Sequence, residues 1–366
     1  MKILHIGLEK SWRGGENQIF LLIQGLKNHN VSSFVAYPAA SRGYEKFQQV
    51  APVLGLPSSS AYDPRSVKLL KDYISQNQID LIDAHSAGAH ALALLVKLIF
   101  PHIKLVVHRR VDNPIKDRLL TRLKYFSSGV DQFVPISDCI KRILIAYGVD
   151  ENKITVVKSA IDINKYDHLD RQRCRSELLQ SLKIKDPGFL LGNASAFTDQ
   201  KGYDVLIQSL KPLNDKGMAF HCILAGDGPL LAEMRALVKN LNLSKKVTFL
   251  GFTDRVPQLL KSLDALVMPS NNEGLGTLVL DAIAAGCCVV GTRVGGIPEM
   301  VINGETGLTV AKGDHVALAR SIEDIILNKD LREHLSKNAQ SYIKSNFSLE
   351  SMVQGNLNVY KSILKN

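Results

Sequence analysis

The chain has 366 residues, which is too long for one ordinary hydrophobic core and suits two domains. Its composition is 45% hydrophobic and 22% charged, as in globular proteins, and the absence of short repeats and low-complexity tracts excludes solenoids and long disordered tails. The formal net charge is +10, and residues 1–165 contain 22 Lys and Arg against 14 Asp and Glu. This excess favours an anionic partner for the first half, such as nucleic acid, acidic lipid or a phosphorylated substrate.

The N-terminal residues lack the apolar core and cleavage site of a signal peptide, and the longest apolar run, 91–100, is too short to span a bilayer. We therefore expect a cytoplasmic protein, and peripheral attachment to the cytoplasmic face of a membrane stays open. The five cysteines are odd in number and form no Cys-x-x-Cys pair, which favours reduced, buried thiols over a disulfide framework or a metal site.

The first half alternates apolar runs of strand length with helical patterns. We expect strands at 2–7, 31–37, 79–84, 103–108 and 132–136, and helices that include 15–28, 65–76 and 87–100. This alternation predicts a parallel sheet with helices on both faces.

The same pattern restarts in the second half, with expected strands at 189–193, 221–225, 247–250, 265–268 and 288–291 and a helix at 202–215. The sequence thus predicts an α/β protein of two Rossmann-like, doubly wound domains facing a central cleft, with ligands beyond the carboxyl ends of the strands. The expected divisions are a first domain at 1–165, a linker at 166–186, a second domain at 187–345 and a final helix at 346–366 that packs back on the first domain.

The strongest motif is Glu273-Gly274-Leu275-Gly276-Thr277, which follows the expected strand at 265–268 and opens a helix. Glycines let the backbone approach a ligand closely, and the free N–H groups of a helix start favour phosphate oxygens. Glu273 can accept hydrogen bonds from sugar hydroxyls, and Asp281, about two helical turns later, can accept them from a ribose diol. A plain loop with a capping carboxylate and a solvated aspartate is the simpler alternative.

At these residues the chain resembles glycosyltransferase family 4, of the GT-B fold, in which a Glu, seven residues and a second Glu stand at this place. Asp281 replaces the second Glu, so the ribose contact keeps its chemistry with a side chain one methylene shorter. The resemblance implies transfer of a sugar from a nucleoside diphosphate sugar to an acceptor hydroxyl with retention at the anomeric carbon. It implies Glu273, His108 and Lys201 as catalytic residues, with no metal and no cofactor beyond the donor substrate.

Two further turns in the second half match the family pattern. Lys201 lies at a strand-to-helix turn, where an ammonium is a good point charge for a diphosphate, and a solvated loop lysine is the alternative. The family's arginine five residues earlier is Ala196 here, so one cation is missing. The turn Gly226-Asp227-Gly228-Pro229 resembles the family turn beside the nucleotide, which implies donor binding by Gly226 and Gly228. Phe252 belongs to a loop that lines the base in the family, but we expect its side chain in the core.

In the first half, Gly14 and Gly15 follow the first strand and open a helix without forming a dinucleotide fingerprint. They resemble the family's glycine loop, which implies a backbone approach to the donor diphosphate across the cleft. His108 ends a strand and resembles the histidine that the family places near the transferred sugar, and His85 fits a second family position. For both, a histidine satisfied by its neighbours is the alternative.

The segment 114–127 is expected to form a basic amphipathic helix, in which Ile115, Leu119, Leu123 and Phe126 share one face. Packing of that face on the core with a solvated rim is one interpretation. Contact with an anionic inner-membrane surface or a phosphorylated acceptor is the other, and some members of the family that the chain resembles use this part of the first domain in that way.

We therefore expect a glycosyltransferase that acts in bacterial surface glycan or lipopolysaccharide biosynthesis on a glycan or lipid-linked acceptor of anionic character. A GT-B sugar-nucleotide epimerase and a non-enzymatic sugar-nucleotide-binding protein are the alternatives, and the missing arginine at Ala196 keeps the second of these open. No helix-turn-helix, RNP or zinc pattern occurs, so we expect no nucleic-acid partner.

Overall fold

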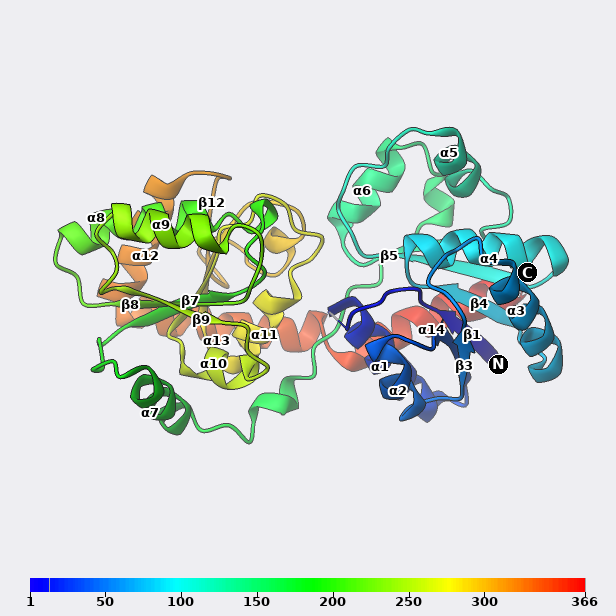
Figure 1. The fold of residues 1–366 in the computed structure, drawn as a ribbon, viewed down its shortest axis with the longest axis horizontal. Helices are drawn as coiled ribbons and strands as arrows, with labels where there is room; N and C mark the ends of the chain where they lie inside the picture. Colours follow the sequence, from blue (N-terminus) through cyan, green and yellow to red (C-terminus); the bar gives the residue numbers. More distant parts are fainter. Residues whose placement is uncertain (13, 366) are drawn as a thin grey trace. The chain divides into compact units, whose positions relative to one another are not determined.

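The computed structural model describes residues 1–12 and 14–365, so Arg13 of the predicted glycine loop lies outside the described residues. The chain forms two compact units (Figure 1), the first made of Met1–Ala160 with the C-terminal stretch from Leu349, and the second of Ile161–Ser348. Each unit contains a six-stranded sheet whose strands pair in parallel. The prediction of an α/β protein with two doubly wound sheets is confirmed.

The sheet of the first unit has the strand order β3-β2-β1-β4-β5-β6. Its strands are β1 (Lys2–Ile6), β2 (Ser32–Pro38), β3 (Val53–Leu56), β4 (Leu81–Ala84), β5 (Lys104–Arg109) and β6 (Gln132–Pro135). The sequence analysis misses β3, because four residues that include a glycine give no strand-length apolar pattern. The strand order reverses between β1 and β4, and in open parallel sheets ligands bind beyond the carboxyl ends of the strands at this point.

The helices of the first unit include one from the far end of the chain. They are α1 (Gly14–Leu26), α2 (Arg42–Gln48), α3 (Pro64–Asn77), α4 (Ala87–Ile99), α5 (Leu119–Tyr125), α6 (Asp138–Ala146) and α14 (Leu349–Lys365). Val353, Leu357 and Tyr360 of α14 form one buried cluster with residues of α1 and of the central strands. Helix α14 therefore covers part of this sheet beside α1.

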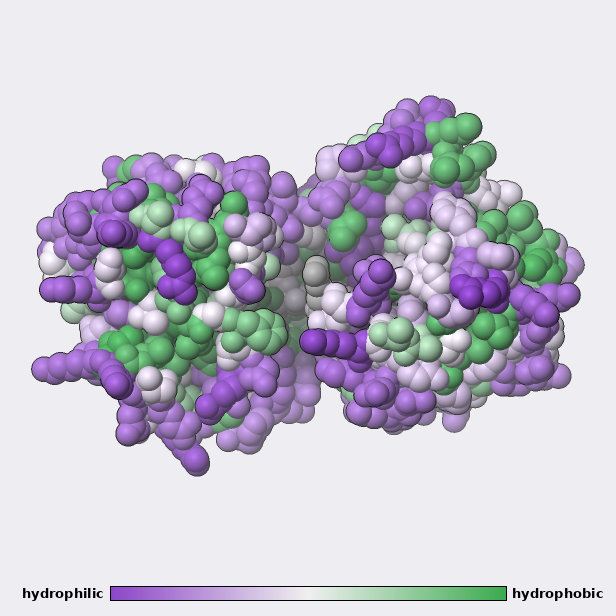
Figure 2. All heavy atoms as spheres, in the orientation of Figure 1, coloured by the Kyte–Doolittle hydropathy of each residue, from purple (hydrophilic) through white to green (hydrophobic). Residues whose placement is uncertain are grey.

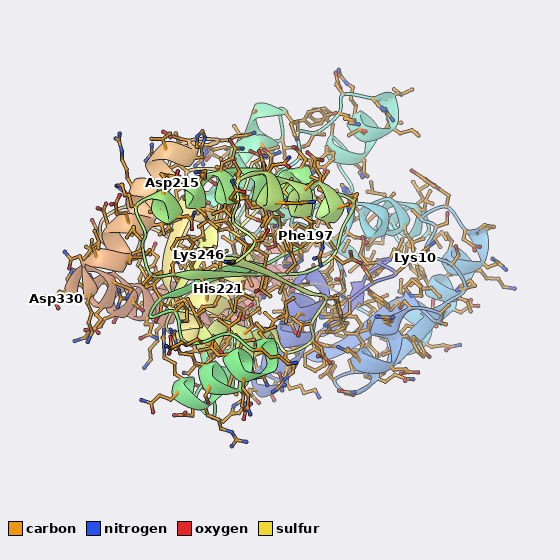
Figure 3. All side chains as sticks on the ribbon, turned by 60° about the vertical axis from the view of Figure 1, so that its left-hand side comes forward. Lys10, Phe197, Asp215, His221, Lys246 and Asp330 are labelled. Carbon is orange, nitrogen blue, oxygen red and sulfur yellow. The ribbon has the colours of Figure 1, made fainter. Side chains whose placement is uncertain are left out.

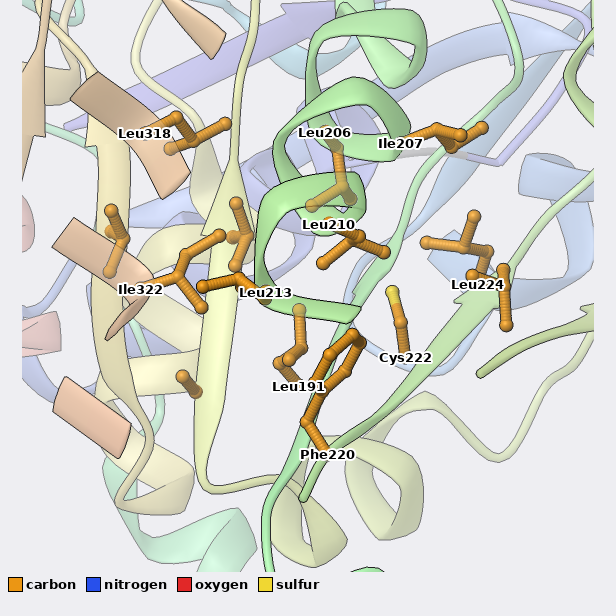
Figure 4. Close-up of a cluster of buried hydrophobic side chains, with 14 of the residues drawn as sticks. Leu191, Leu206, Ile207, Leu210, Leu213, Phe220, Cys222, Leu224, Leu318 and Ile322 are labelled. Carbon is orange, nitrogen blue, oxygen red and sulfur yellow. The ribbon is translucent and has the colours of Figure 1, made fainter. Parts of the chain in front are cut away.

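The sheet of the second unit has the strand order β12-β11-β10-β7-β8-β9. Its strands are β7 (Leu190–Ala194), β8 (His221–Ala225), β9 (Val247–Gly251), β10 (Ala265–Met268), β11 (Cys288–Thr292) and β12 (Leu308–Val310). Its α-helices are α7 (Arg171–Leu182), α8 (Tyr203–Asp215), α9 (Leu231–Asn240), α10 (Val256–Ser262), α11 (Thr277–Ala285), α12 (His315–Leu327) and α13 (Lys329–Asn346). Leu206, Leu210 and Leu213 of α8 pack on Leu191 and Leu224 of the sheet (Figure 4).

Residues labelled in Figure 3 mark the amino ends and the carboxyl ends of strands in the second sheet. His221 and Lys246 lie where β8 and β9 begin, and Phe197 lies beyond the end of β7. The loops near Phe197 are therefore on the carboxyl edge, where a ligand is expected.

The segment 166–186, which the sequence analysis takes as a linker, contains helix α7 and belongs to the second unit. Arg171 donates to Asp264 at 3.0 Å, and Arg175 donates to the same carboxylate at 2.8 Å. Helix α7 has only two buried residues, Cys174 and Leu179, so ionic contacts supplement a small apolar face. Hydrophobic periodicity alone therefore gives little sign of it.

The five cysteines are free, and four of them are buried. Burial raises the pKa of the Cys287 thiol to about 12, which keeps it protonated. The prediction of buried thiols is confirmed for these four, and their reduced state remains a prediction. No helix among the described residues is long and apolar enough to cross a bilayer.

The packing of α14 on α1 depends on the missing side chain of Gly25, because a Cβ there would lie 2.3 Å from Cγ2 of Val353. We predict that Gly25→Val lowers the free energy of unfolding by about 1–3 kcal/mol through overpacking. Urea denaturation followed by circular dichroism measures it. Gln24→Val, at the exposed neighbouring position, controls for the helix propensity of valine. An equal loss in both variants would contradict the packing argument.

Candidate functional site

Two of the predicted catalytic residues of the second unit are in direct contact. Lys201 ends a 3-10 turn after β7, and Glu273 lies in the loop between β10 and α11. Nζ of Lys201 donates to Oε2 of Glu273 at 2.5 Å, and Ser270 Oγ donates to the same oxygen at 3.4 Å. Both charged side chains are largely shielded, with 18% and 11% of their surface exposed. A cation for phosphate and an acceptor for hydroxyls thus stand together on the carboxyl edge of the sheet.

The predicted donor-binding residues Gly274, Leu275, Gly276 and Thr277 form the approach to helix α11. Gly276 is the N-cap residue and has no side chain that could accept a hydrogen bond from the first N–H groups of α11. The carbonyl of Gly276 accepts from the N–H of Val279, in the first turn, at 2.8 Å. The Leu275 side chain is buried, which leaves only its backbone for a ligand. At such a helix start, backbone N–H groups can donate hydrogen bonds to phosphate oxygens.

Gly295 and Gly296, which the sequence analysis did not select, support the Glu273 loop from below. The N–H of Gly296 donates to the carbonyl of Glu273 at 2.9 Å. Gly295 has a φ of +54°, and a Cβ there would lie 1.6 Å from that carbonyl oxygen. The sequence contained this signal, because paired glycines in the loop after a predicted strand allow a close backbone approach.

The turn that contains Gly226 and Gly228 packs directly on the loop after β7. A Cβ on Gly226, whose φ is +131°, would lie 2.0 Å from the carbonyl oxygen of Ser195. The hydroxyl of Tyr203 is 3.0 Å from the Ser195 nitrogen and 2.9 Å from its carbonyl oxygen. These contacts fix the loop that carries exposed Ala196, the position where the family has an arginine.

Asp281 accepts hydrogen bonds from a turn of its own unit. Lys165 Nζ donates to Oδ1 of Asp281, and the Tyr166 hydroxyl donates to the same oxygen at 2.8 Å. Burial and the neighbouring carboxylate raise the pKa of Tyr166, so its hydroxyl stays protonated and can donate. A ribose hydroxyl that used Asp281 would have to share these partners or displace them.

Phe252 is not in the core, and that expectation is wrong. Its side chain is 81% exposed. Gly251 ends β9 with a φ of +78°, and its carbonyl accepts a hydrogen bond from Gly226 at 2.8 Å. The backbone turns at Gly251, so the next side chain leaves the sheet beside the Gly226 turn.

The predicted residues of the first unit gather around a pocket of about 340 Å³. Its lining includes Gly15, Glu16, His85, His108, Arg109 and Arg110. These residues lie at the start of α1, directly after β4 and at the end of β5, on both sides of the point where the strand order reverses. Gly14 begins α1 next to Gly15. The structure therefore brings His85 and His108 together at the edge that the topology favours.

Beneath this pocket lies the fully buried carboxylate of Asp83, in β4. Its Oδ1 is 3.1 Å from Nε2 of His108, and its Oδ2 is 3.3 Å from Nε2 of His85. Tyr360 of α14 donates to Oδ2 at 2.5 Å. Although burial alone would raise the pKa of Asp83, His108 and His85 hold it well below its ordinary value. Burial lowers the pKa of His85 to about 3. At neutral pH the aspartate is charged and this histidine is not.

His5, Asp83 and His85 are the described residues that could hold a metal ion, since one ligand atom from each lies within 4.8 Å of the others. The position of Arg110 disfavours metal binding by His85. Its Nη2 is 3.3 Å from Nδ1 of His85, and a guanidinium can only donate. Nε2 of a neutral His85 then carries the proton, which occupies the position that a metal would need. The absence of a metal remains a prediction.

Asp83, Arg110 and Tyr360 were missed by the sequence analysis. An aspartate inside the apolar strand Leu81–Ala84 is a usable signal, because a buried charge needs partners. Tyr360 carries no such signal, since 277 positions separate it from Asp83.

The predicted helix at 114–127 is shorter in the structure and covers only Leu119–Tyr125, as α5. Ile115 lies before it and packs against the core of the first unit. Leu119, Leu123 and Phe126 are 74%, 62% and 48% exposed. Core packing therefore does not account for most of the predicted apolar face.

We predict that Gly295→Ala destabilises the protein by about 2 kcal/mol or more, because the new methyl group displaces the Glu273 backbone. Gly313→Ala is a matched control, since φ is +76° there and a Cβ would meet nothing within 4 Å. It should cost only about 1 kcal/mol of backbone strain. Urea unfolding compares the two, and equal losses would show that crowding against Glu273 is unimportant.

Comparison with known proteins agrees with this architecture. The family model "Glycosyltransferase Family 4" matches residues 12–165, and "Glycosyl transferases group 1" matches residues 175–342. An uncharacterized glycosyltransferase of Methanocaldococcus jannaschii is 32% identical over 312 residues, which cover 83% of this chain and 81% of that protein. N-acetyl-alpha-D-glucosaminyl L-malate synthase of Bacillus anthracis is 25% identical over 322 residues, with coverage of 83% and 80%.

Solved structures share the fold across the whole chain. Anabaena Alr3699/HepE, solved with UDP, has a TM-score of 0.87 at 23% identity and covers 99% of this chain and 100% of its own. A glycosyltransferase of Rickettsia africae also has a TM-score of 0.87, at 22% identity, with coverage of 100% and 99%. The resemblance found in the motifs is confirmed, and the chain belongs to glycosyltransferase family 4 as a glycosyltransferase of the GT-B fold.

Proposed function

We propose that the protein transfers a sugar from a nucleoside diphosphate sugar to an acceptor hydroxyl, with retention of configuration, and that the second unit holds the donor. The contact between Lys201 and Glu273 at the start of α11 carries the proposal. In the free protein each charge partly satisfies the other. A donor can replace both halves of the pair, because its diphosphate suits the ammonium and its sugar hydroxyls suit the carboxylate.

The same residues supply what the reaction requires. As the sugar leaves, negative charge grows on the diphosphate, and Lys201 with the N–H groups that precede α11 stabilises it. The proposed attack is on the front face, with the leaving phosphate accepting the proton of the acceptor hydroxyl. We propose that Gly226 and Gly228 bind the donor beside its nucleotide. We propose that the backbone at Gly14 and Gly15 approaches the diphosphate. Exposed Phe252 offers a face on which a base can stack.

Uridine diphosphate sugars are the first donors to test. Alr3699/HepE was solved with UDP and with UDP-glucose. The relatives also include a lipopolysaccharide core biosynthesis glycosyltransferase of Rhizobium meliloti, 32% identical over 166 residues and 45% of this chain. We propose an anionic glycan or lipid-linked acceptor of this kind, which suits the basic first half of the chain.

We predict that Glu273→Ala lowers release of nucleoside diphosphate from the preferred donor by at least about a hundredfold, since it removes an interaction with the reacting sugar. UDP-, GDP- and ADP-sugars are incubated with the protein, first without acceptor and then with lipopolysaccharide core fragments. Released diphosphate and isomerised sugar are measured. Glu305→Ala, at an exposed position, is the control and should match the wild type.

The outcomes separate the candidate functions. Undiminished turnover by Glu273→Ala would overturn the assigned role. Isomerised sugar in place of transfer would identify an epimerase. Donor-induced thermal stabilisation with no turnover of any donor would identify a binding protein.

We also propose that α5 touches an anionic membrane surface. Leu119, Leu120 and Leu123 are exposed on this short helix, and the hydrophobic residues over it stand out in Figure 2. Exposed Lys116, Arg118 and Arg122 are close by in sequence. Exposed leucines beside basic side chains match the chemistry of an acidic lipid surface.

We predict that replacing Leu119, Leu120 and Leu123 with serine weakens binding to vesicles that contain anionic lipid by about tenfold or more. Co-sedimentation measures it, with vesicles of purely zwitterionic lipid for comparison. The double variant Val316→Ser and Leu327→Ser, which alters exposed apolar residues of the second unit, is the control. Equal binding by the leucine variant and this control would remove α5 from the proposal.

A further inference from the structure

The proposed function assigns no role to Asp83 or Tyr360, yet their contact places a buried charge below the pocket of the first unit. Asp83, His5 and Tyr360 are buried, and His85 and His108 line the pocket. Burying a carboxylate costs free energy unless hydrogen-bond donors surround it. The positions of the carboxylate and of these hydrogen-bond donors determine which histidine nitrogens carry protons.

The tautomer of His85 follows from Arg110. The guanidinium Nη2 lies 3.3 Å from Nδ1 of His85 and can only donate, so Nδ1 carries a lone pair. Because the ring is neutral, its proton is on Nε2. That nitrogen faces Oδ2 of Asp83 at 3.3 Å, and the carboxylate oxygen can accept its proton in a hydrogen bond.

The tautomer of His108 follows from Asp83. Nε2 of His108 lies 3.1 Å from Oδ1, and a lone pair on both atoms at that distance would be repulsive. Burial lowers the pKa of His108, which favours a neutral ring with one proton, and the carboxylate attracts this proton to Nε2. Nδ1 is left as an acceptor. Both ring nitrogens of His108 are buried without a hydrogen bond of ordinary geometry to a described residue, so the 3.1 Å approach of the carboxylate to Nε2 is what distinguishes them.

We propose that Asp83 and Tyr360 are positioning residues that hold His108 in the tautomer whose Nδ1 accepts a hydrogen bond from a hydroxyl group in the pocket. Tyr360 fixes the carboxylate by donating to Oδ2 at 2.5 Å, and Asp83 fixes the ring. The last helix of the chain thereby sets the chemistry of the pocket wall. The tautomer follows from the contacts of the two histidines and from their burial, and the occupant, a carbohydrate hydroxyl, rests on the proposed function.

The experiment reads the tautomer directly from nitrogen-15 NMR spectra of histidine-labelled, full-length protein without substrate. Protonated and unprotonated ring nitrogens differ strongly in chemical shift, and His108→Gln identifies the His108 signals. In the wild type we expect a proton on Nε2 and none on Nδ1. Asp83→Asn should reverse this, because the amide can donate to Nε2. Tyr360→Phe keeps the carboxylate but loosens it, so a minor population with Nδ1 protonated should appear.

Two matched controls report on general effects of substitution in the same unit. Asp131→Asn alters a carboxylate that pairs with Lys97 outside the pocket lining. Tyr37→Phe removes a buried hydroxyl that has no hydrogen-bond partner among the described residues. Both should leave the His108 spectrum unchanged. A wild-type proton on Nδ1, or an unchanged tautomer in both Asp83→Asn and Tyr360→Phe, would overturn the proposal.

Titration with zinc ions alone tests the competing use of the cluster. Stoichiometric binding that removes the proton from Nε2 of His85 and is lost in His5→Ala would make the site a metal centre and overturn the positioning role. Unchanged spectra support that role.

Activity supplies a second readout, once a donor and an acceptor are known. Asp83→Asn should lower kcat by at least about tenfold, and Tyr360→Phe by less. Donor-induced thermal stabilisation should be retained in both variants. If the NMR result holds while no transfer is found, the tautomer stands and the proposed function fails. A reversed tautomer with unchanged kcat would remove His108 from the reaction.

Discussion

A parallel sheet must be covered on both faces, and in the first unit part of that cover comes from the far end of the chain. Helix α14 lies beside α1, where the missing side chain of Gly25 lets Val353 approach. The same docking puts the Tyr360 hydroxyl on the buried Asp83 carboxylate. The packing of α14 thus buries its apolar face and at the same time positions the Tyr360 hydroxyl. A change that loosens α14 should therefore disturb the pocket as well as the core.

The second unit solves a different problem, which is to bring several loop backbones together at one edge. Gly226 lets one turn approach Ser195, and Gly295 lets another approach Glu273, at distances that any side chain would prevent. The Lys201–Glu273 contact sits on this scaffold. Its charges satisfy each other in the free protein, which lowers the cost of holding them ready for a ligand. In this view the pair is a preorganised but replaceable contact.

The two units also differ in how they treat charge. In the second unit, Lys201 and Glu273 keep a small exposed surface and form a direct ion pair. In the first, a fully buried aspartate contacts imidazoles and a tyrosine, and Arg110 contacts one of the imidazoles, that of His85. Burial lowers the pKa of His85 to about 3. Such a network fixes proton positions over a wide pH range, which is what a hydrogen-bond acceptor on a pocket wall requires. The chemistry proposed for each unit follows from this difference.

The sequence by itself determined the two sheets, most of their strands and the loops at their carboxyl edges, because apolar period and glycine turns are local signals. The motifs around Glu273 and Lys201 indicated the family for the same reason. Only the tertiary structure decided that Lys201 contacts Glu273, that Asp281 contacts Lys165 and Tyr166, and that Phe252 is exposed. It alone brought Tyr360 to Asp83, since contacts between residues far apart in the chain depend on packing, which no local pattern records.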